Sequence, residues 1–370
     1  MRALILSADV GESHAAMARA LARGLERLPE VETAAVMSDF SMLGPLLGRV
    51  LARGFEFHLG RVQWSYDLAY RLFTGVRAAQ RLGERALFAL GGRALLARIE
   101  REAPDVVVST YPVLNPVLSE LRRRGRLGCP LALVVGPLGG LGFWIQPGAD
   151  LHLLQYPQVR AEVERIAGPG RAVQVRPLVR EEFFERFSQQ RARERLGIVA
   201  PGPLVLVSGG GWGAGDLGGA IEVCLSLPGA RVIAVCGRNE GQRRALAARF
   251  AGERRVEVLG FTERMRELLW AADAFVTATA GLSVIEARLC GCPSVCFGFA
   301  FGHVRDNTRA LARAGLARLA ATPAQLARAL GEALAEGRFE PPSFERVPTA
   351  AEATVALWRG EATERATAAS

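Results

Sequence analysis

The sequence predicts an α/β protein with two doubly wound parallel sheets. Three observations support this fold class. The chain has 370 residues, of which half are hydrophobic, and a chain of this size ordinarily forms two domains with separate cores. Short apolar runs alternate with helical segments, as is typical of parallel strands buried on both faces. Several of these runs end in glycine-rich turns, where such sheets bind ligands.

The first half supplies one set of elements. The expected strands are 3–8, 31–37, 105–110, 130–136, 150–155 and 172–177. A helix is expected from about 14 to 28, with Ser13 as its N-cap and His14 in its first turn.

Residues 40–103 break the alternation, and we interpret them as a helical insertion rich in Arg. Its aromatic residues are Phe55, Phe57, Trp64, Tyr66, Tyr70 and Phe73. Arg with Trp and Tyr on helices suits an anionic membrane surface. Helices packed on the domain, with Arg extended into solvent, would have the same composition. Both interpretations stay open.

The second half repeats the alternation more clearly. Its expected strands are 203–210, 231–237, 255–261, 274–279 and 294–299. The domain boundaries that follow are 1–178 and 179–345, with 346–370 as a C-terminal helix and a polar tail that is expected to be mobile.

Charge and cysteine content narrow the class of protein. The net charge is +9, and all 46 basic residues are Arg, which reflects codon bias as much as function. No run of about twenty apolar residues predicts a membrane span, and Asp9 comes too early for a signal peptide. Cys290, Cys292 and Cys296 are interpreted as reduced, buried thiols of a cytosolic protein rather than as a metal site.

The opening loop, "SADVGESHAA", is the first candidate site. It has a single glycine, Gly11, and therefore does not fit the dinucleotide fingerprint. The dipole of the following helix disfavours imidazolium at His14. His14 is thus expected to stay neutral and able to accept a proton.

Two later junctions carry candidate anion and sugar sites. The glycine-rich turn at 207–221 lets backbone amides approach a phosphate, and it lacks the Gly-Lys-Ser/Thr of an ATP-hydrolysing P-loop. The turn at 279–283 leads into a helix that contains Ser283 and Glu286, and their spacing has two interpretations. They form a capping box, or the start of the helix faces a phosphate and Glu286 binds a ribose diol. Four polar residues follow the last expected strand, and we expect them to form a loop that holds sugar hydroxyls: His303, Arg305, Asp306 and Asn307. Alternatively, Asp306 caps the helix that follows.

These motifs resemble one glycosyltransferase family. "GGGWG", "AVCGRN", "VLGFTERMRELLWAADAFVT", "GLSVIEA" and "GHVRDN" follow in family order between 203 and 317, and "SADVGESHAAMA" resembles the family's N-terminal motif. The family contains the monogalactosyldiacylglycerol synthases and processive diacylglycerol glucosyltransferases, with the peptidoglycan lipid-I N-acetylglucosaminyltransferases more distant. The resemblance implies the GT-B fold, in which two Rossmann-like domains face a cleft.

The resemblance also implies roles for residues. It places the uracil at Phe261 and Thr262 and the ribose at Glu286. His14 would be the general base, with Asp9 orienting it or serving as base itself. The remaining donor-site residues are Gly210, Gly211, Gly281, Leu282 and Ser283 at the diphosphate, Arg305, Asp306 and Asn307 at the sugar, and Gly237 and Arg238 in "AVCGRN".

The chain departs from the family pattern in three loops. Gly11-Glu12-Ser13 replaces a triple glycine, and Glu12 is expected to repel a nearby diphosphate. Thr279-Ala280-Gly281 replaces a Pro-Gly-Gly or Lys-Pro-Gly. Gly136-Pro137, followed by "LGGLGFW", replaces a Thr-Asp pair. These changes indicate a divergent branch.

The function that the resemblance implies is metal-independent, inverting transfer of a hexose from a UDP-sugar to a lipid or other hydrophobic acceptor. The donor is a substrate, and no cofactor and no nucleic acid is expected. The expected location is the cytoplasm, peripheral on the inner face of the cell membrane. Two other classes remain open: a UDP-sugar epimerase of the same fold, and a non-catalytic descendant that binds a nucleotide-sugar or a membrane.

Overall fold

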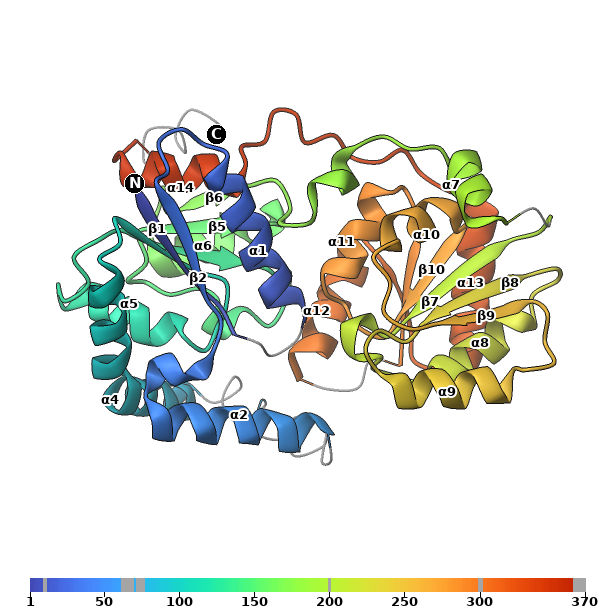
Figure 1. Ribbon diagram of the computed structural model, residues 1–370, viewed down its shortest axis with the longest axis horizontal. Coiled ribbons are helices and arrows are strands. Elements are labelled where there is room, and N and C mark those ends of the chain that lie inside the picture. Colours follow the sequence, from blue (N-terminus) through green and yellow to red (C-terminus); the bar gives the residue numbers. More distant parts are fainter. Residues whose placement is uncertain (9–11, 61–69, 71–76, 199–200, 299–301, 362–370) are drawn as a thin grey trace. The chain divides into compact units, whose positions relative to one another are not determined.

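The computed structural model describes residues 1–8, 12–60, 70, 77–198, 201–298 and 302–361. The chain folds into two compact units, residues 1–178 together with 344–370, and residues 179–343. Each unit has one parallel sheet with helices packed beside it (Figure 1). The predicted fold class is therefore confirmed.

The first unit has a sheet that contains six strands within the described residues, and every pair is parallel. Strands β3 and β4 are buried along their whole length, as their unbroken apolar runs require when helices cover both faces. In spatial order the strands are β2 (Thr33–Met37), β1 (Arg2–Leu6), β3 (Val106–Ser109), β4 (Leu131–Val135), β5 (Leu151–Leu154) and β6 (Ala172–Gln174).

The helices of the first unit include the predicted insertion, which is helical where the structure describes it. Its parts η1 (Phe40–Leu43), α2 (Pro45–Gly60) and α4 (Arg77–Glu102) follow β2, and α2 and α4 both pack against η1. The other helices are α1 (Glu12–Glu26), α5 (Asn115–Arg123), η2 (Leu141–Phe143), η3 (Pro157–Val159), α6 (Arg160–Ala167) and α14 (Ala350–Trp358).

The start of α1 differs from the prediction. The helix begins at Glu12, so Ser13 is its second residue and not its N-cap. An acidic first residue is favourable there because it faces the positive end of the helix dipole. Gly11, which precedes the helix, lies outside the described residues.

The C-terminal segment belongs to the first unit. Helix α14 packs against α1, and the backbone of Gly24 approaches Ala351 closely. Arg176 anchors the segment, because its Nε donates to the carbonyl oxygens of Phe344 (3.0 Å) and Val347 (3.1 Å). Thr349 and Glu352 form a capping box at the start of α14. The polar tail at 362–370 lies outside the described residues.

The second unit repeats the arrangement, again with six strands within the described residues. Helix α13 packs against α8, and α10 packs against α7. In spatial order the strands are β12 (Arg318–Ala320), β11 (Ser294–Phe297), β10 (Ala274–Thr277), β7 (Leu204–Ser208), β8 (Arg231–Val235) and β9 (Val256–Leu259). The helices are η4 (Glu181–Phe184), α7 (Gln189–Leu196), η5 (Gly210–Trp212), α8 (Leu217–Leu225), α9 (Glu240–Arg249), α10 (Met265–Ala271), α11 (Leu282–Leu289), α12 (Gly302–Arg313) and α13 (Pro323–Glu336).

Strand β12 is absent from the prediction. It has three residues, which is too short for a hydrophobic period to show in the sequence. It forms because its backbone pairs with β11 at Val295–Phe297. The second core, centred on β7, β8, β10, α8 and α13, closes over it through Ala320.

Among the described residues, no helix is both long enough and apolar enough to cross a membrane.

Candidate functional site

The strands of the second sheet are parallel, so the loops that follow them gather at one edge of that sheet. All the donor-site residues that the sequence predicts lie in or directly after these loops. They are Gly210 and Gly211 after β7, Gly237 and Arg238 after β8, Phe261 and Thr262 after β9, Gly281, Leu282, Ser283 and Glu286 after β10, and Arg305, Asp306 and Asn307 after β11.

The glycine loops after β7 and β8 touch backbone to backbone. The amide of Arg238 donates to the carbonyl oxygen of Gly211 (2.8 Å). A Cβ atom on Gly237, whose φ is +58°, would lie 2.4 Å from the carbonyl oxygens of both Gly210 and Gly211. Only glycine fits there, because any side chain would collide with main-chain atoms that have no room to move. The close contact between the two loops therefore requires glycine at position 237.

Helix α11 has no side-chain cap. Its N-cap is Gly281, so Ser283 is the second helical residue, and of the two interpretations of Ser283 and Glu286 the capping box is wrong. The Ser283 hydroxyl oxygen is buried and has no hydrogen-bond partner within the described structure. The first amides of any helix also lack intrahelical acceptors. The start of α11 thus offers unsatisfied donors of the kind that bind phosphate.

Glu286 lies one turn further along α11. Its side chain is partly buried, and this desolvation raises the pKa of its carboxyl to about 7. The Arg180 guanidinium acts in the opposite direction, while the Glu182 carboxylate adds to the increase. A carboxylate in this position can accept hydrogen bonds from a diol, and it does so best in its ionised form.

The polar residues after β11 are helical and not in a loop, because α12 begins at Gly302. Asp306 is the fifth residue of α12, so its interpretation as a helix cap is wrong. Asn307 is buried, and its amide donates to the carbonyl oxygen of Ala280, which ties α12 to the turn before α11. The Arg305 Nε and Asp306 Oδ1 atoms lie 4.0 Å apart. His303 is exposed in the first turn.

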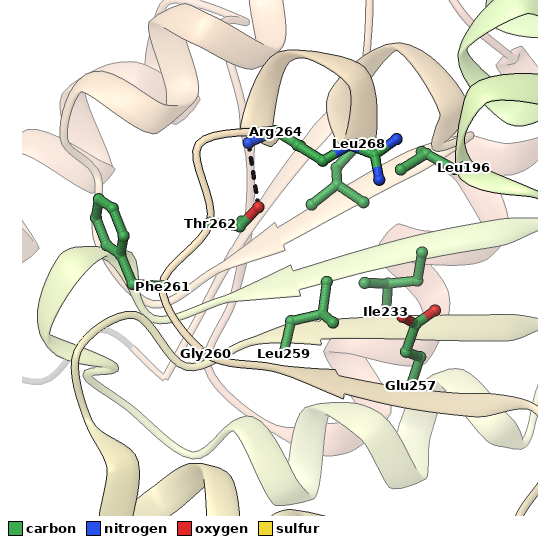
Figure 2. A pocket seen from close by; sticks show the side chains of 9 residues that line it. All are labelled: Leu196, Ile233, Glu257, Leu259, Gly260, Phe261, Thr262, Arg264 and Leu268. Carbon is green, nitrogen blue, oxygen red and sulfur yellow. Dashed lines mark hydrogen bonds between the residues drawn. The ribbon is translucent and has the colours of Figure 1, made fainter.

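The turn after β9 borders a cavity of about 240 Å³. Figure 2 shows Phe261 and Thr262 on this turn, with Ile233 and Leu259 on the neighbouring strands. The Arg238 guanidinium lies 4.3 Å from the centre of the Phe261 ring, an arrangement typical of a cation–π contact. Phe261 is 50% exposed. The cavity is lined by Leu196, Ile233, Glu257, Leu259, Gly260, Phe261, Thr262, Arg264 and Leu268.

In the first unit, His14 is the third residue of α1 and is partly buried. Its Nδ1 atom lies 2.9 Å from the carbonyl oxygen of Thr110, directly after β3. A carbonyl oxygen can only accept, so Nδ1 carries the proton of this hydrogen bond. In the neutral ring the lone pair is then on Nε2, which is the tautomer that a general base needs.

Two aromatic rings hold the imidazole. The Tyr111 ring meets it edge-on with centroids 4.9 Å apart, and the Trp144 ring stacks on it at 5.5 Å. Sequence reasoning missed Thr110, Tyr111 and Trp144 as partners of His14. The one available signal was the unusual "LGGLGFW", which ends in Trp144.

The residues around the start of α1 bear on the expectation that Glu12 repels a diphosphate. Asp9 and Gly11 lie outside the described residues. Glu12 forms an ion pair with Arg19, two turns along α1, with 2.7 Å between Oε1 and Nη2. The charge of Glu12 is therefore partly balanced within its own helix.

The cysteines of the second unit are reduced and buried. Burial raises the pKa of the Cys292 and Cys296 thiols to about 12, and it raises the pKa of Cys290 as well. Thiols of this kind are unreactive near neutral pH. No cluster of three or more His, Cys, Asp or Glu with metal-binding geometry occurs in the described part of the chain.

Two family models match the chain. Residues 14–174 match the model described as monogalactosyldiacylglycerol (MGDG) synthase, and residues 224–336 match the model described as glycosyl transferases group 1. The resemblance that the motifs indicate is confirmed: both units are related to glycosyltransferases.

The curated relatives are also glycosyltransferases. A processive diacylglycerol beta-glucosyltransferase of Staphylococcus saprophyticus is 26% identical over 62% of this chain, which spans 59% of that relative's length. A protein of the same name from Bacillus licheniformis is 24% identical over 82% of this chain and 79% of its own.

Solved structures share the fold of the whole chain. MurG of Acinetobacter baumannii aligns with a TM-score of 0.60 and 15% identity over 97% of this chain and 99% of its own. Anabaena Alr3699/HepE in complex with UDP aligns with a TM-score of 0.54 and 14% identity over 100% of this chain and 99% of its own. The predicted GT-B fold is thereby confirmed.

Replacing Gly237 by Ala should destabilise the second unit by about 1–3 kcal/mol, because the new Cβ forces the two glycine loops apart or strains the backbone. The measurement is urea unfolding followed by circular dichroism. Gly252→Ala is the matched control, since a Cβ there meets nothing within 4 Å. Equal midpoints for the two variants would contradict the close approach.

Proposed function

We propose that this relative of the MGDG synthases and diacylglycerol glucosyltransferases transfers a hexose from a UDP-sugar to the hydroxyl of a neutral lipid such as diacylglycerol. The names of the relatives, diacylglycerol glucosyltransferases, support the lipid acceptor, and the UDP complex of a structural neighbour supports the nucleotide. In the proposed reaction the anomeric centre is inverted and no metal takes part.

The start of α11 is the observation that carries the donor proposal. It combines a buried Ser283 hydroxyl without a partner, uncapped amides and the Glu286 carboxyl within two turns. A nucleoside diphosphate matches this set, because its phosphates accept from the amides and the hydroxyl while its ribose diol donates to the carboxylate. We assign the nucleobase to the turn at Phe261 and Thr262.

The proton transfer is assigned to His14. Its Nε2 lone pair takes the proton of the acceptor hydroxyl while that oxygen forms a bond to C1 of the sugar. The bond from C1 to the diphosphate oxygen breaks on the opposite face, and UDP leaves with the electron pair. The imidazolium that forms keeps its Nδ1 hydrogen bond to Thr110, which stabilises the charge. Asp9 is assigned an orienting role.

The leaving group needs stabilisation as its negative charge grows. We assign this to the amides at the start of α11 and in the loop at Gly210 and Gly211. Preorganised backbone donors of this kind stabilise developing charge without a metal ion. Arg305 and Asp306, in the first turns of α12, are assigned to the sugar hydroxyls.

The same proposal places the chain at the inner face of the cell membrane, in contact through α2 and α4. Leu46 and Val50, one turn apart on α2, are 74% and 60% exposed. Leu82 and Leu90 on α4 are 68% and 69% exposed. Exposed Arg residues alternate with these side chains, as is typical of helices that bind anionic lipid surfaces; they are Arg49, Arg53, Arg81 and Arg85. The side chains of Phe55, Phe57, Trp64, Tyr66 and Phe73 lie outside the described residues.

Replacing His14 by Ala should lower the turnover by roughly 100- to 10,000-fold, the usual contribution of a general base. The assay follows UDP release from UDP-glucose with diacylglycerol vesicles in the presence of EDTA, because the proposed reaction uses no metal. Binding of UDP by calorimetry is the control and should not change. Unchanged turnover would contradict the assignment of the base. Conversion of the UDP-sugar without acceptor, followed by NMR, would indicate an epimerase instead.

Affinity for UDP-glucose should rise by roughly tenfold between pH 6 and pH 8. The pKa of Glu286 is about 7, so the carboxylate that accepts the ribose hydroxyls is mostly protonated at pH 6 and mostly ionised at pH 8. Calorimetry across this range measures the effect directly. Glu286→Gln is neutral at every pH, so its weaker binding should be independent of pH. A pH dependence that persists in this variant would exclude Glu286 as its origin.

A double substitution of Leu46 and Val50 by Ser should weaken binding to phosphatidylglycerol vesicles by at least tenfold. Burial of one such side chain is worth roughly 1.5–3 kcal/mol, and both are exposed before binding. Co-sedimentation with the vesicles gives the affinity. Val36→Ser is the control, because Val36 is an exposed apolar residue of the same unit on β2. Equal loss in the control would contradict a specific surface on α2.

A further inference from the structure

His14 is held by two segments that are distant in sequence. The carbonyl oxygen of Thr110 and the ring of Tyr111 follow β3, whereas the ring of Trp144 comes after β4 and η2. The position of the imidazole therefore depends on how the exits of these two strands are fixed relative to each other. Trp144 itself is only 7% exposed, so its ring is part of a packed wall and not a surface group.

Asn115 joins the two segments. It begins α5, is 0% exposed, and uses both ends of its side-chain amide. The amide nitrogen donates to the carbonyl oxygens of Phe143 (3.2 Å) and Trp144 (3.4 Å). The amide oxygen accepts from the Ser109 hydroxyl (2.7 Å). The reverse orientation would set the amide oxygen against two carbonyl oxygens, so these partners fix which end is which.

Ser109 extends the connection to Tyr111. The Ser109 hydroxyl oxygen accepts from the Tyr111 amide (3.3 Å) while its proton goes to Asn115. Asn115 thus connects, through one hydroxyl, to the segment that carries Thr110 and Tyr111, and directly to the backbone that carries Trp144. The side chains of Asn115 and Ser109 are buried, where hydrogen bonds are geometrically strict and expensive to leave unmade.

We propose that Asn115 is a positioning residue, which sets the location and orientation of the His14 imidazole through Trp144 and through the Thr110–Tyr111 segment. The inference rests on the proposed role of His14 for its effect on turnover, but the effect on the imidazole itself is independent of that role. A displacement of about 1 Å is enough to cost roughly 100-fold in rate when a catalytic group must meet a reacting atom.

Asn115→Asp tests the proposal with little change in volume. The carboxylate still accepts from Ser109 but has no proton for Phe143 and Trp144, so the loop after η2 is released. Ser119→Ala is the matched control. Ser119 lies on the same helix one turn later, and its hydroxyl accepts from the amide of Gly148 (3.0 Å), beyond Trp144 on the same loop.

The first readout needs no activity. The chain has four histidines, and the imidazole NMR signals of His14 are identified by their loss in His14→Ala. In Asn115→Asp these signals should shift, because the ring currents of Tyr111 and Trp144 change with geometry. In Ser119→Ala they should stay in place. Unshifted His14 signals in Asn115→Asp would overturn the proposal whether or not His14 is catalytic.

The second readout is a double-substitution cycle with UDP-glucose and diacylglycerol vesicles. Asn115→Asp should lower kcat by about 10- to 100-fold with donor KM within about twofold. In the His14→Ala background the same change should have almost no effect, since a residue that acts through His14 has nothing left to position. An equal loss in both backgrounds would mean a general effect on the fold and would overturn the proposal. Full activity of His14→Ala itself would instead contradict the proposed base.

If Asn115→Asp does not fold, Ser109→Ala replaces it. This variant removes one hydroxyl and leaves the two amide donors of Asn115 in place. It should shift the same His14 signals by a smaller amount and lower kcat by a few-fold. Unchanged His14 signals would again overturn the proposal.

Discussion

Parallel pairing of all the described strands is the constraint on which both units depend. A parallel strand can be followed only by a crossover, so helices cover the faces of each sheet and leave little room for polar groups inside it. The strands β3, β4, β7 and β10 are accordingly buried over their whole length. Most polar groups then lie at the strand ends, and parallel direction brings these ends to a common edge.

The polar groups at that edge come from different sources in the two units. In the second unit the backbone itself provides the donors, and glycines such as Gly237 let one loop approach another to the distance of main-chain contact. In the first unit the proposed base is a side chain, His14, and aromatic and amide groups hold it in place. A site built from backbone amides tolerates few side chains nearby, whereas a site built around one functional side chain requires several specific neighbours.

This difference decides what the sequence could predict. The alternation of strands and helices, the division into two halves and the candidate donor loops all follow from local patterns, because strands and glycine turns are local in sequence. The spacing of Ser283 and Glu286 was ambiguous, since a capping box and a ligand site share it. Only the position of Gly281 as N-cap separates them. The start of α1 and strand β12 were missed because one residue of cap geometry and three residues of strand leave almost no periodic signal.

The environment of His14 lay beyond sequence reasoning for a different reason. Thr110 and Trp144 are 96 and 130 residues away in the chain, and nothing in the local pattern joins them to a histidine. A tautomer depends on which atom faces Nδ1, and that atom is a main-chain carbonyl that every residue possesses. No residue type in the sequence indicates a contact of this kind. The sequence could therefore indicate that His14 stands at a helix start, but not that its Nε2 carries the lone pair.

The start of α1 also bears on the kind of acceptor that the proposed reaction would use. Glu12 occupies the first turn, where a free helix start would otherwise attract phosphate, and its charge is directed to Arg19 on the same helix. Although Arg19 partly balances it, a carboxylate at this point disfavours a second anion, because two like charges near one helix terminus compete for the same dipole. The α2 and α4 surface, with its exposed Leu and Val, suits the hydrocarbon part of a lipid. An acceptor whose reacting end is an uncharged hydroxyl fits both features, whereas a lipid whose reacting end carries phosphate fits only the second.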